Sequence, residues 1–379
     1  MQINIHSEIK QIAVDDWNNL VSDNNPFLRH EFLAALENNN CVSDQFGWHP
    51  CHIAIRKNEK LIAAMPLYSK MNSYGEFVFD HAWADAYQRN QLAYYPKLVS
   101  SIPYTPASGQ RLLSSPDDEQ QDELFQLLIE TVKQFSRQQS FSGFHCLFPL
   151  EKELEWMKKQ GFLIRHDCQF HWNNQDYTNF EDFLETLEKK KRKNIRQERK
   201  RVSQQKVSLR ILNGHTATNR DWDDFTLFYK QTFSEKYGTA TLNQGFFKEI
   251  AKNLPDQTVL VLADKPDGQC IAGSLMYTSD TTLYGRHWGC TEQIDKLHFE
   301  ACYYQGIEYC IKHKLKVFEP GAQGEHKIAR GFIPTLTRSA HWLNQSPFDE
   351  SIRAFIKHEK SAIKQYMSSL KSPYKKVGG

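Results

Sequence analysis

The sequence predicts an α/β (α+β) protein of two related halves, each with a mixed, mostly antiparallel sheet flanked by helices. The first observation is an internal likeness, because residues 62–68 resemble residues 271–277. The second is that each stretch follows an alternating apolar segment and a polar turn, the pattern of a β-hairpin. These segments and turns are 52–55 with 57–60 in the first half, and 259–262 with 264–269 in the second.

The order of elements after each hairpin is also similar. We expect a third strand at 77–79 and at 282–284, each followed by a tryptophan, Trp83 or Trp288. In the second half a helix at 299–313 and a strand at 316–318 come next. One order that occurs twice, about 200 residues apart, indicates tandem domains rather than a solenoid.

Other segments fill the two halves. Apolar residues at helical spacing, with Gly161 as a terminator, predict helices in the first half, and a buried strand lies between them. The predicted helices are 117–139, 151–160, 183–205, 222–234 and 349–370, and the strand is 141–148. We predict an N-terminal domain at 1–176 and a C-terminal domain at 177–379 that begins with the basic helix at about 183–205.

Composition excludes several classes of protein. Lys and Arg (47) nearly balance Asp and Glu (45), so only local charge clusters can indicate a partner. The first residues lack the basic start and apolar core of a signal peptide, and no apolar run approaches the roughly 20 residues that span a bilayer. The eight cysteines include no C-x-x-C pair, which is typical of reduced cytosolic thiols. We therefore expect a cytoplasmic protein with no membrane span, no metal site and no bound cofactor.

Several longer stretches carry a family resemblance. In the second half these are 225–232, 283–289, 297–305 and 321–332, and in the first half 79–87 and 94–98. The chain from about 25 to 350 resembles the FemAB-like group of N-acyltransferases, a group labelled peptidoglycan biosynthesis proteins. The resemblance implies two GNAT-type domains and the transfer of an acyl or aminoacyl group to an amine.

The strongest catalytic candidates lie in one loop of the second half. Acyl transfer to an amine needs a base for the amine proton and donors for the oxyanion. Glu325, His326 and Lys327 supply such groups among several glycines that let the backbone approach a ligand closely. A Lys followed by Gly-Phe is a feature that the resemblance implies, so Lys327 is the first choice for the stabilising cation. Gln323 and Arg330 are candidate substrate-binding residues in the same loop.

A second group of candidates follows the hairpin of the second half. On an unbroken strand Tyr284, Arg286 and Trp288 point to one side, so Tyr284 and Arg286 can face a cleft together. A half-buried strand is the plainer alternative. His298 and Glu300 lie at an expected helix start, where Glu300 is either catalytic or a favourable charge for the helix dipole. We assign Tyr284, Arg286 and Glu300 to catalysis, and Trp288 and His298 to substrate binding.

The first half contains a polar and aromatic group that is unusual for a strand exit. Buried carboxylates beside His and Trp are costly unless they are paired. We interpret the group as substrate-binding; its members are Asp80, His81, Trp83, Asp85 and Tyr87.

The basic run is the strongest anomaly of composition. Glu188 and Glu198 are the only acids nearby, too few to neutralise it, so a polyanionic partner competes with a plain solvated helix. The candidate nucleic-acid-binding residues are Lys189, Lys190, Lys191, Arg192, Lys193, Arg196, Arg199 and Lys200.

The donor is either aminoacyl-tRNA or acyl-CoA. The chain has no good copy of the Gln/Arg-x-x-Gly-x-Gly/Ala turn that holds the CoA pyrophosphate, and the basic helix suits phosphate contacts with tRNA. We favour aminoacyl-tRNA as co-substrate, with a small-molecule or peptide amine as acceptor. The alternatives are an acyl-CoA-dependent N-acyltransferase acting on a small amine, and a non-catalytic RNA-binding protein on a degenerate acyltransferase scaffold.

Overall fold

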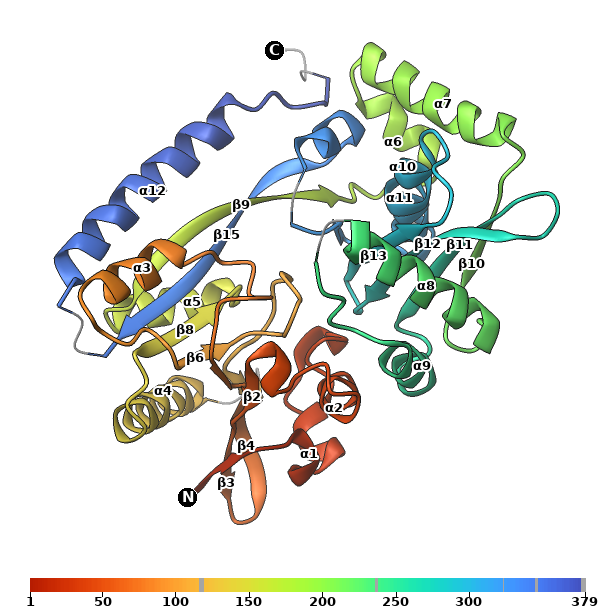
Figure 1. The fold of residues 1–379 in the computed structure, drawn as a ribbon. Helices are drawn as coiled ribbons and strands as arrows, with labels where there is room; N and C mark the ends of the chain where they lie inside the picture. The colour runs from red at the N-terminus through yellow and green to blue at the C-terminus, as the bar shows by residue number, and fades with distance from the viewer. Residues whose placement is uncertain (116–118, 236–237, 323, 345–346, 376–379) are drawn as a thin grey trace. The chain divides into compact units, whose positions relative to one another are not determined.

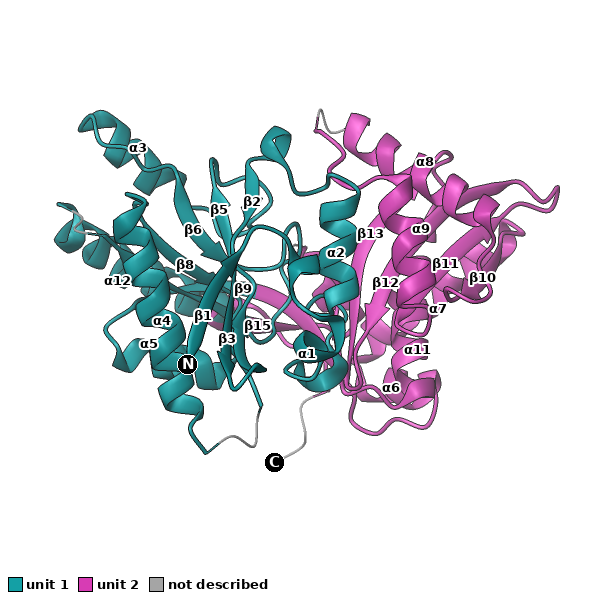
Figure 2. Cartoon of the chain, turned by 90° about the horizontal axis from the view of Figure 1, so that it is seen from below, with its two compact units in different colours: residues 1–168, 336–367 teal, residues 169–335, 368–379 magenta. Residues whose placement is uncertain are grey.

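The computed structural model describes residues 1–115, 119–235, 238–322, 324–344 and 347–375. The chain forms two compact units, shown in Figure 1 along the chain and in Figure 2 by unit. Unit 1 consists of 1–168 and 336–367, and unit 2 of 169–335 and 368–379.

Unit 1 contains two sheets with helices packed on them. Its strands are β1 (Gln2–His6), β2 (Trp48–Pro50), β3 (His52–Lys57), β4 (Lys60–Met65), β5 (Tyr68–Lys70), β6 (Lys97–Ser100), β7 (Leu113–Ser114), β8 (Gly143–Leu147) and parts of β9 (Leu163–Asn173) and β15 (Ile333–Leu343). Its helices are α1 (Val14–Asn18), α2 (His30–Asn38), α3 (His81–Arg89), α4 (Gln121–Gln138), α5 (Glu151–Lys159) and most of α12 (Asp349–Ser369), with short 3-10 turns at Ile9–Gln11, Ser22–Asn24 and Asp44–Phe46. One sheet has the order β1-β3-β4-β7, and the other β15-β8-β6-β5-β2.

Unit 2 contains one sheet of the order β10-β11-β12-β13-β14-β9. Its strands are β10 (Ser208–Leu212), β11 (Thr258–Asp264), β12 (Cys270–Thr278), β13 (Thr282–Cys290), β14 (Val317–Glu319) and the end of β9. Its helices are α6 (Phe180–Thr186), α7 (Lys189–Gln204), α8 (Asn219–Glu235), α9 (Gln244–Asn253), α10 (Leu297–Phe299), the π-helical turn η4 (Glu300–Tyr304), α11 (Gln305–His313) and the 3-10 turn η5 (Glu325–Arg330).

The two units repeat one pattern of strand pairing. In unit 1, β5 is antiparallel to β6, β6 is parallel to β8, and β8 is antiparallel to β15. In unit 2, β12, β13, β14 and β9 pair in the same three ways. A helix connects the parallel strands in each unit, α4 in the first and α11 in the second. The expected α/β class with two related halves is therefore confirmed.

The two compact units differ from the expected division at 176. Residues 336–367 belong to unit 1, because 339–343 of β15 pair with 143–147 of β8. Conversely, Trp172 and Asn173 of β9 pair with β14 and belong to unit 2. Strand β9 thus comes from the first half of the sequence but ends the repeated pattern of unit 2. Strand β15 comes from the second half but ends the pattern of unit 1. No local sequence pattern indicates this exchange.

Two local expectations were wrong. Residues 77–79 form no strand, and Phe77 has a φ of 60°. The hairpin is followed by the short strand β5, and the next strand, β6, begins only at Lys97, twenty residues beyond Phe77. Trp83 accordingly lies in α3, whereas Trp288 lies in β13. The predicted helix at 183–205 is broken at Leu187, which is extended and pairs with Tyr374, so it forms α6 and then α7.

Candidate functional site

Lys327 lies in the turn η5, after strand β14 of unit 2. Its side chain is buried and its Nζ donates a hydrogen bond to the carbonyl oxygen of Gly321 at 2.7 Å. Burial lowers the pKa of Lys327 to about 8, and the neighbouring Cys302 thiol opposes that shift. Gly321 has a φ of 95°, which glycine adopts without strain. The turn therefore holds a buried lysine whose pKa of about 8 lies well below its ordinary value.

His326 stands next to Lys327 and reaches the surface. Its Nε2 lies 2.9 Å from the hydroxyl oxygen of Tyr303, within hydrogen-bond distance. Partial burial and the charges of Arg330 and Lys327 lower the pKa of His326 below its ordinary value. The imidazole is therefore mainly neutral at pH 7 and able to accept a proton. Glu325, the third predicted member of this group, is exposed.

Arg330 connects the turn to the basic helix α7. Its Nη2 donates to Oε1 of Glu198 at 2.7 Å, and its Nη1 donates to the backbone oxygen of His326 at 2.6 Å. The guanidinium also lies 3.4 Å from the ring centroid of Phe299. Tyr304 donates its hydroxyl proton to the other oxygen of Glu198. Glu198 thus fixes α7 against η5 within unit 2.

The π-helical turn η4 places several of these side chains. A π turn inserts one residue into a helix and is frequent at functional sites. Glu300 is buried at its start, and Arg199 donates to both of its oxygens, at 3.1 and 2.9 Å. Gln305 also donates to Glu300, at 2.8 Å. Both carboxylate oxygens of Glu300 therefore accept hydrogen bonds from neighbouring side chains. These contacts give Glu300 a structural role.

Strand β13 is interrupted at the predicted candidates. Leu275 pairs with His287 and Met276 with Gly285, so Arg286 is the extra residue of a β-bulge. The alternation that placed Tyr284 and Arg286 on one side assumed an unbroken strand, and the bulge removes that basis. Burial lowers the pKa of Arg286 to about 10.

The remaining candidates of unit 2 lie nearby or outside the described residues. The ring of Trp288 contacts that of His298 edge-on at 5.3 Å, and His298 also packs on Tyr303 at 5.3 Å. These rings extend the aromatic surface beside His326. Gln323 lies outside the residues that the structure describes.

Helix α7 separates its arginines from its lysines. Arg192 and Arg196 pair with acids of α6, and Arg199 pairs with Glu300 and Glu308. The expectation that acids were too few is wrong for these arginines, because the fold brings distant carboxylates to them. Five lysines form no ion pair with any described residue: Lys189, Lys190, Lys191, Lys193 and Lys200. All but the half-buried Lys191 are exposed.

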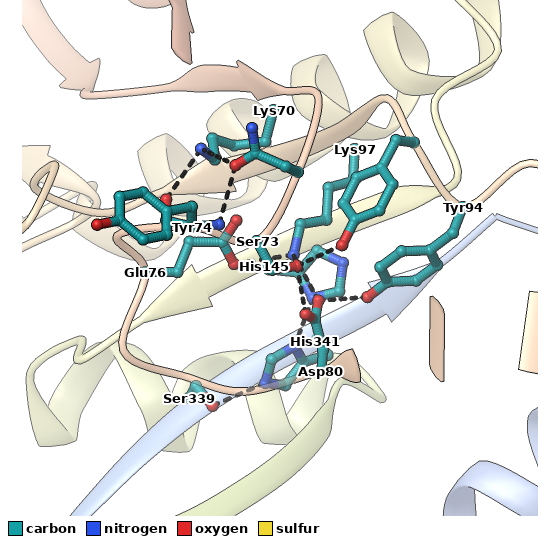
Figure 3. Close-up of polar contacts among 12 residues, drawn as sticks. Lys70, Ser73, Tyr74, Glu76, Asp80, Tyr94, Lys97, His145, Ser339 and His341 are labelled. Carbon is teal, nitrogen blue, oxygen red and sulfur yellow. Dashed lines mark hydrogen bonds and ion pairs between the residues drawn. The ribbon is translucent and has the colours of Figure 1, made fainter. Parts of the chain in front are cut away.

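Unit 1 contains a buried ionic cluster that the sequence did not predict (Figure 3). Lys97 is completely buried at the start of β6, and its Nζ contacts Asp80, Glu76 at 2.8 Å and Ser73 at 3.0 Å. Tyr94 and Ser73 also donate to Asp80, each at 2.5 Å. Burial would raise the pKa of Asp80, but the Lys97 charge holds it well below its ordinary value. Burial raises the pKa of Glu76 to about 7.

A histidine pair lies beside this cluster in Figure 3. Nδ1 of His145 in β8 and Nδ1 of His341 in β15 are 2.6 Å apart, and Nε2 of His341 lies 2.7 Å from Oγ of Ser339. Burial lowers the pKa of His145 to about 3 and that of His341 well below its ordinary value. Both rings are therefore neutral at pH 7.

The first-half candidates divide between core and surface. Asp80 belongs to the ionic cluster, Trp83 packs on His341 at 5.2 Å, and Tyr87 lies in an apolar cluster. His81 and Asp85 are exposed. Lys97, Glu76 and the two histidines were missed, although a lysine opening an otherwise apolar strand is a signal that could have found Lys97.

The described residues contain neither a grouped metal site nor a membrane-spanning helix. Among them, no three or more His, Cys, Asp and Glu side chains are grouped as a metal site would require. No helix in the described part of the chain is both long and apolar enough to span a membrane.

Solved structures with the same fold are distant in sequence. The C-terminal domain of a putative lysylphosphatidylglycerol synthetase from Agrobacterium fabrum has a TM-score of 0.56 at 8% identity, covering 91% of this chain and 95% of that one. FemX has a TM-score of 0.54 at 11% identity, covering 93% and 100%. L-PGS from Bacillus licheniformis has a TM-score of 0.52 at 9% identity, covering 86% and 95%. At these identities the likeness shows the fold alone.

Sequence comparison identifies the family. No curated protein sequence matches the chain significantly. The FemAB_like family, described as peptidoglycan biosynthesis/recognition, matches residues 8–376. The match covers nearly the whole chain and agrees with the two units of like strand pairing and with the FemX fold. The chain therefore belongs to the FemAB-like family.

Proposed function

We propose that this protein transfers an aminoacyl group from an aminoacyl-tRNA to an amine, with unit 2 as the donor and catalytic unit. One observation carries the proposal: the basic helix α7 is fixed to the turn that contains Lys327. Glu198 of α7 bonds to Arg330 of η5, three residues beyond Lys327. A surface for phosphates and a buried titrating lysine are thus parts of one packed structure.

The lysines of α7 supply the phosphate contacts. An acceptor stem presents closely spaced phosphates, which Lys binds without reading the base sequence. Lys189, Lys190, Lys193 and Lys200 are exposed and their charges are not compensated by a described acid. The arginines of the same helix are engaged in ion pairs and serve to hold it in place.

His326 and Lys327 carry the chemistry in this proposal. The acceptor amine attacks the ester carbonyl carbon, a C–N bond forms, and the amine proton passes to the neutral His326. Lys327, as an ammonium, stabilises the tetrahedral oxyanion. The ester C–O bond then breaks and the terminal ribose hydroxyl of the tRNA leaves with a proton from His326.

The test measures binding of mixed aminoacylated tRNA at two salt concentrations. One variant has Lys189, Lys190, Lys193 and Lys200 changed to Gln, and a matched control has four exposed lysines of unit 1 changed to Gln. The control positions are Lys57, Lys60, Lys158 and Lys159. We expect the α7 variant to bind more weakly and to have a shallower salt dependence, because each phosphate contact contributes a log–log slope of about −0.7 to −0.9. The control should bind as the wild type does.

Other outcomes would point to the alternatives. Equal, weak binding by all three proteins would contradict a tRNA donor, and thermal stabilisation by acyl-CoAs would then indicate a CoA donor. Tight tRNA binding that depends on α7 and is unchanged by Lys327→Ala, without any aminoacyl transfer, would indicate an RNA-binding protein without catalysis.

A further inference from the structure

Unit 1 contains a small pocket that the proposed function does not use. Its volume is about 200 Å³, below the roughly 300–1,000 Å³ of drug-sized sites, so it fits a short ligand. It is lined by residues of β9, β15 and α12 together with Phe79 and Phe148. All of the lining residues belong to unit 1.

Arg165 lines this pocket and has an unsatisfied donor. Its Nε and Nη2 donate to Glu359, the shortest contact being 2.6 Å, and its guanidinium lies 5.1 Å from the ring centroid of Trp83. Its Nη1 is buried and has no hydrogen-bond partner among the described residues. A buried donor left unsatisfied costs about 1–3 kcal/mol, so such groups call for an explanation.

Thr337 adds a second group of the same kind. It lies on β15 two residues before Ser339, so the two side chains lie on the same face of the strand. Thr337 is buried, and its Oγ1 has no hydrogen-bond partner among the described residues.

The histidine pair makes Ser339 a third donor. Nε2 of His145 is buried without a described partner, and an orphaned N–H is rarer in proteins than an orphaned acceptor. The favoured arrangement therefore puts the proton of His145 on Nδ1, which donates to His341. His341 then donates from Nε2 to Ser339, a contact drawn in Figure 3, and the Ser339 hydroxyl proton is left without a described acceptor at the wall of the pocket.

From these three donors we propose that the pocket binds a small acyl compound through its carbonyl or carboxylate oxygen. Phe79, Phe148 and Ile363 form an apolar wall for its short chain. Asp167 and Glu359 also line the pocket, and their charges favour a neutral ester or amide over an anion. The site lies in unit 1 and does not depend on a tRNA donor or on Lys327.

The experiment titrates the full chain with butyramide, butyrate and butylamine and follows binding by ligand-observed NMR. We expect saturable binding of butyramide and no binding of butylamine, which cannot accept from the three donors. Thr337→Val and Ser339→Ala should each weaken binding about tenfold. Thr337→Ser keeps the hydroxyl and should restore it, and Thr131→Val, which removes a hydroxyl bound to Leu127 of α4, should change nothing.

The outcomes separate cleanly. Tighter binding of butyrate than of butyramide would retain the acyl-oxygen site and assign it to anions. The proposal is overturned if neither acyl compound binds. Unchanged affinity in Thr337→Val and Ser339→Ala, with melting temperatures equal to the wild type, would overturn it as well, as would equal binding of butylamine.

Discussion

At the scale of single residues, Lys97 is surrounded by two carboxylates where no water reaches it. Lys97 is 0% exposed and Asp80 is 2% exposed. Removing one member of such a cluster leaves an uncompensated buried charge, which costs about 3–5 kcal/mol. We expect Lys97→Met to lower the free energy of unfolding by that amount in urea titrations. Lys60→Met, at an exposed position, should stay within about 0.5 kcal/mol of the wild type.

A second test at Lys97 distinguishes charge from packing. If the lost charge causes the effect, the triple variant Lys97→Met, Asp80→Asn, Glu76→Gln should regain part of the stability, because neither carboxylate is then left buried without the Lys97 charge. Equal stability of the triple and single variants would mean that shape, rather than charge, decides the loss.

Lys327 and His326 together predict the pH dependence of transfer. The proposed mechanism needs neutral His326, whose lowered pKa puts the acid limb of the rate profile below its ordinary value of 6.5. It also needs protonated Lys327, whose pKa of about 8 makes the rate fall as pH rises through 8. Lys327→Arg should move the alkaline limb upward, since Arg stays charged. An alkaline limb that remains at 8 in this variant would contradict the role of Lys327.

At the scale of elements, α7 divides its charges between structure and binding. Arg199 neutralises the buried Glu300, so Arg199→Ala leaves a carboxylate without its cation. We expect that variant to lose about 1–3 kcal/mol of unfolding free energy. Lys200→Ala, one position further, should leave stability unchanged within about 0.5 kcal/mol. Thermal unfolding of the two variants side by side measures the difference, and equal losses would refute the division.

The elements also show where sequence patterns fail. The predicted helix 117–139 is found as α4 over Gln121–Gln138, and its positions 117 and 118 lie outside the described residues. The helix 349–370 is found as α12, because long amphipathic stretches bury one face in any fold that contains them. The break at Leu187 was not predicted, since the extended backbone there depends on pairing with Tyr374, far along the chain. The bulge at Arg286 likewise depends on the partner strand β12.

At the scale of the whole molecule, unit 1 needs a segment from the end of the sequence. Residues 339–343 pair with β8, and Ile352 and Ile356 of α12 pack in a cluster with Trp83 and Tyr87. A fragment of residues 1–176 exposes these partners. We expect it to show no cooperative thermal transition by near-UV circular dichroism.

A second fragment contains all of unit 1, with residues 1–168 joined to 336–367 through a flexible linker. It contains every strand of the repeated pattern in unit 1, and we expect it to unfold in one transition. A cooperative transition in the 1–176 fragment would contradict this account and support the division expected from the sequence.

Local periodicity and long specific stretches were enough to indicate the α/β class, the two related halves, most helices and the family. The sequence also drew attention to the pair His326 and Lys327 and to the basic run, because the residues of each group are neighbours along the chain. Which strands close each sheet, and which acids neutralise the arginines of α7, became known from the folded chain alone. The tertiary structure alone brought Lys97, Asp80, His145 and His341 together. The physical reason is that strand pairing and burial of charge join residues up to about 200 positions apart, and no local pattern encodes such contacts.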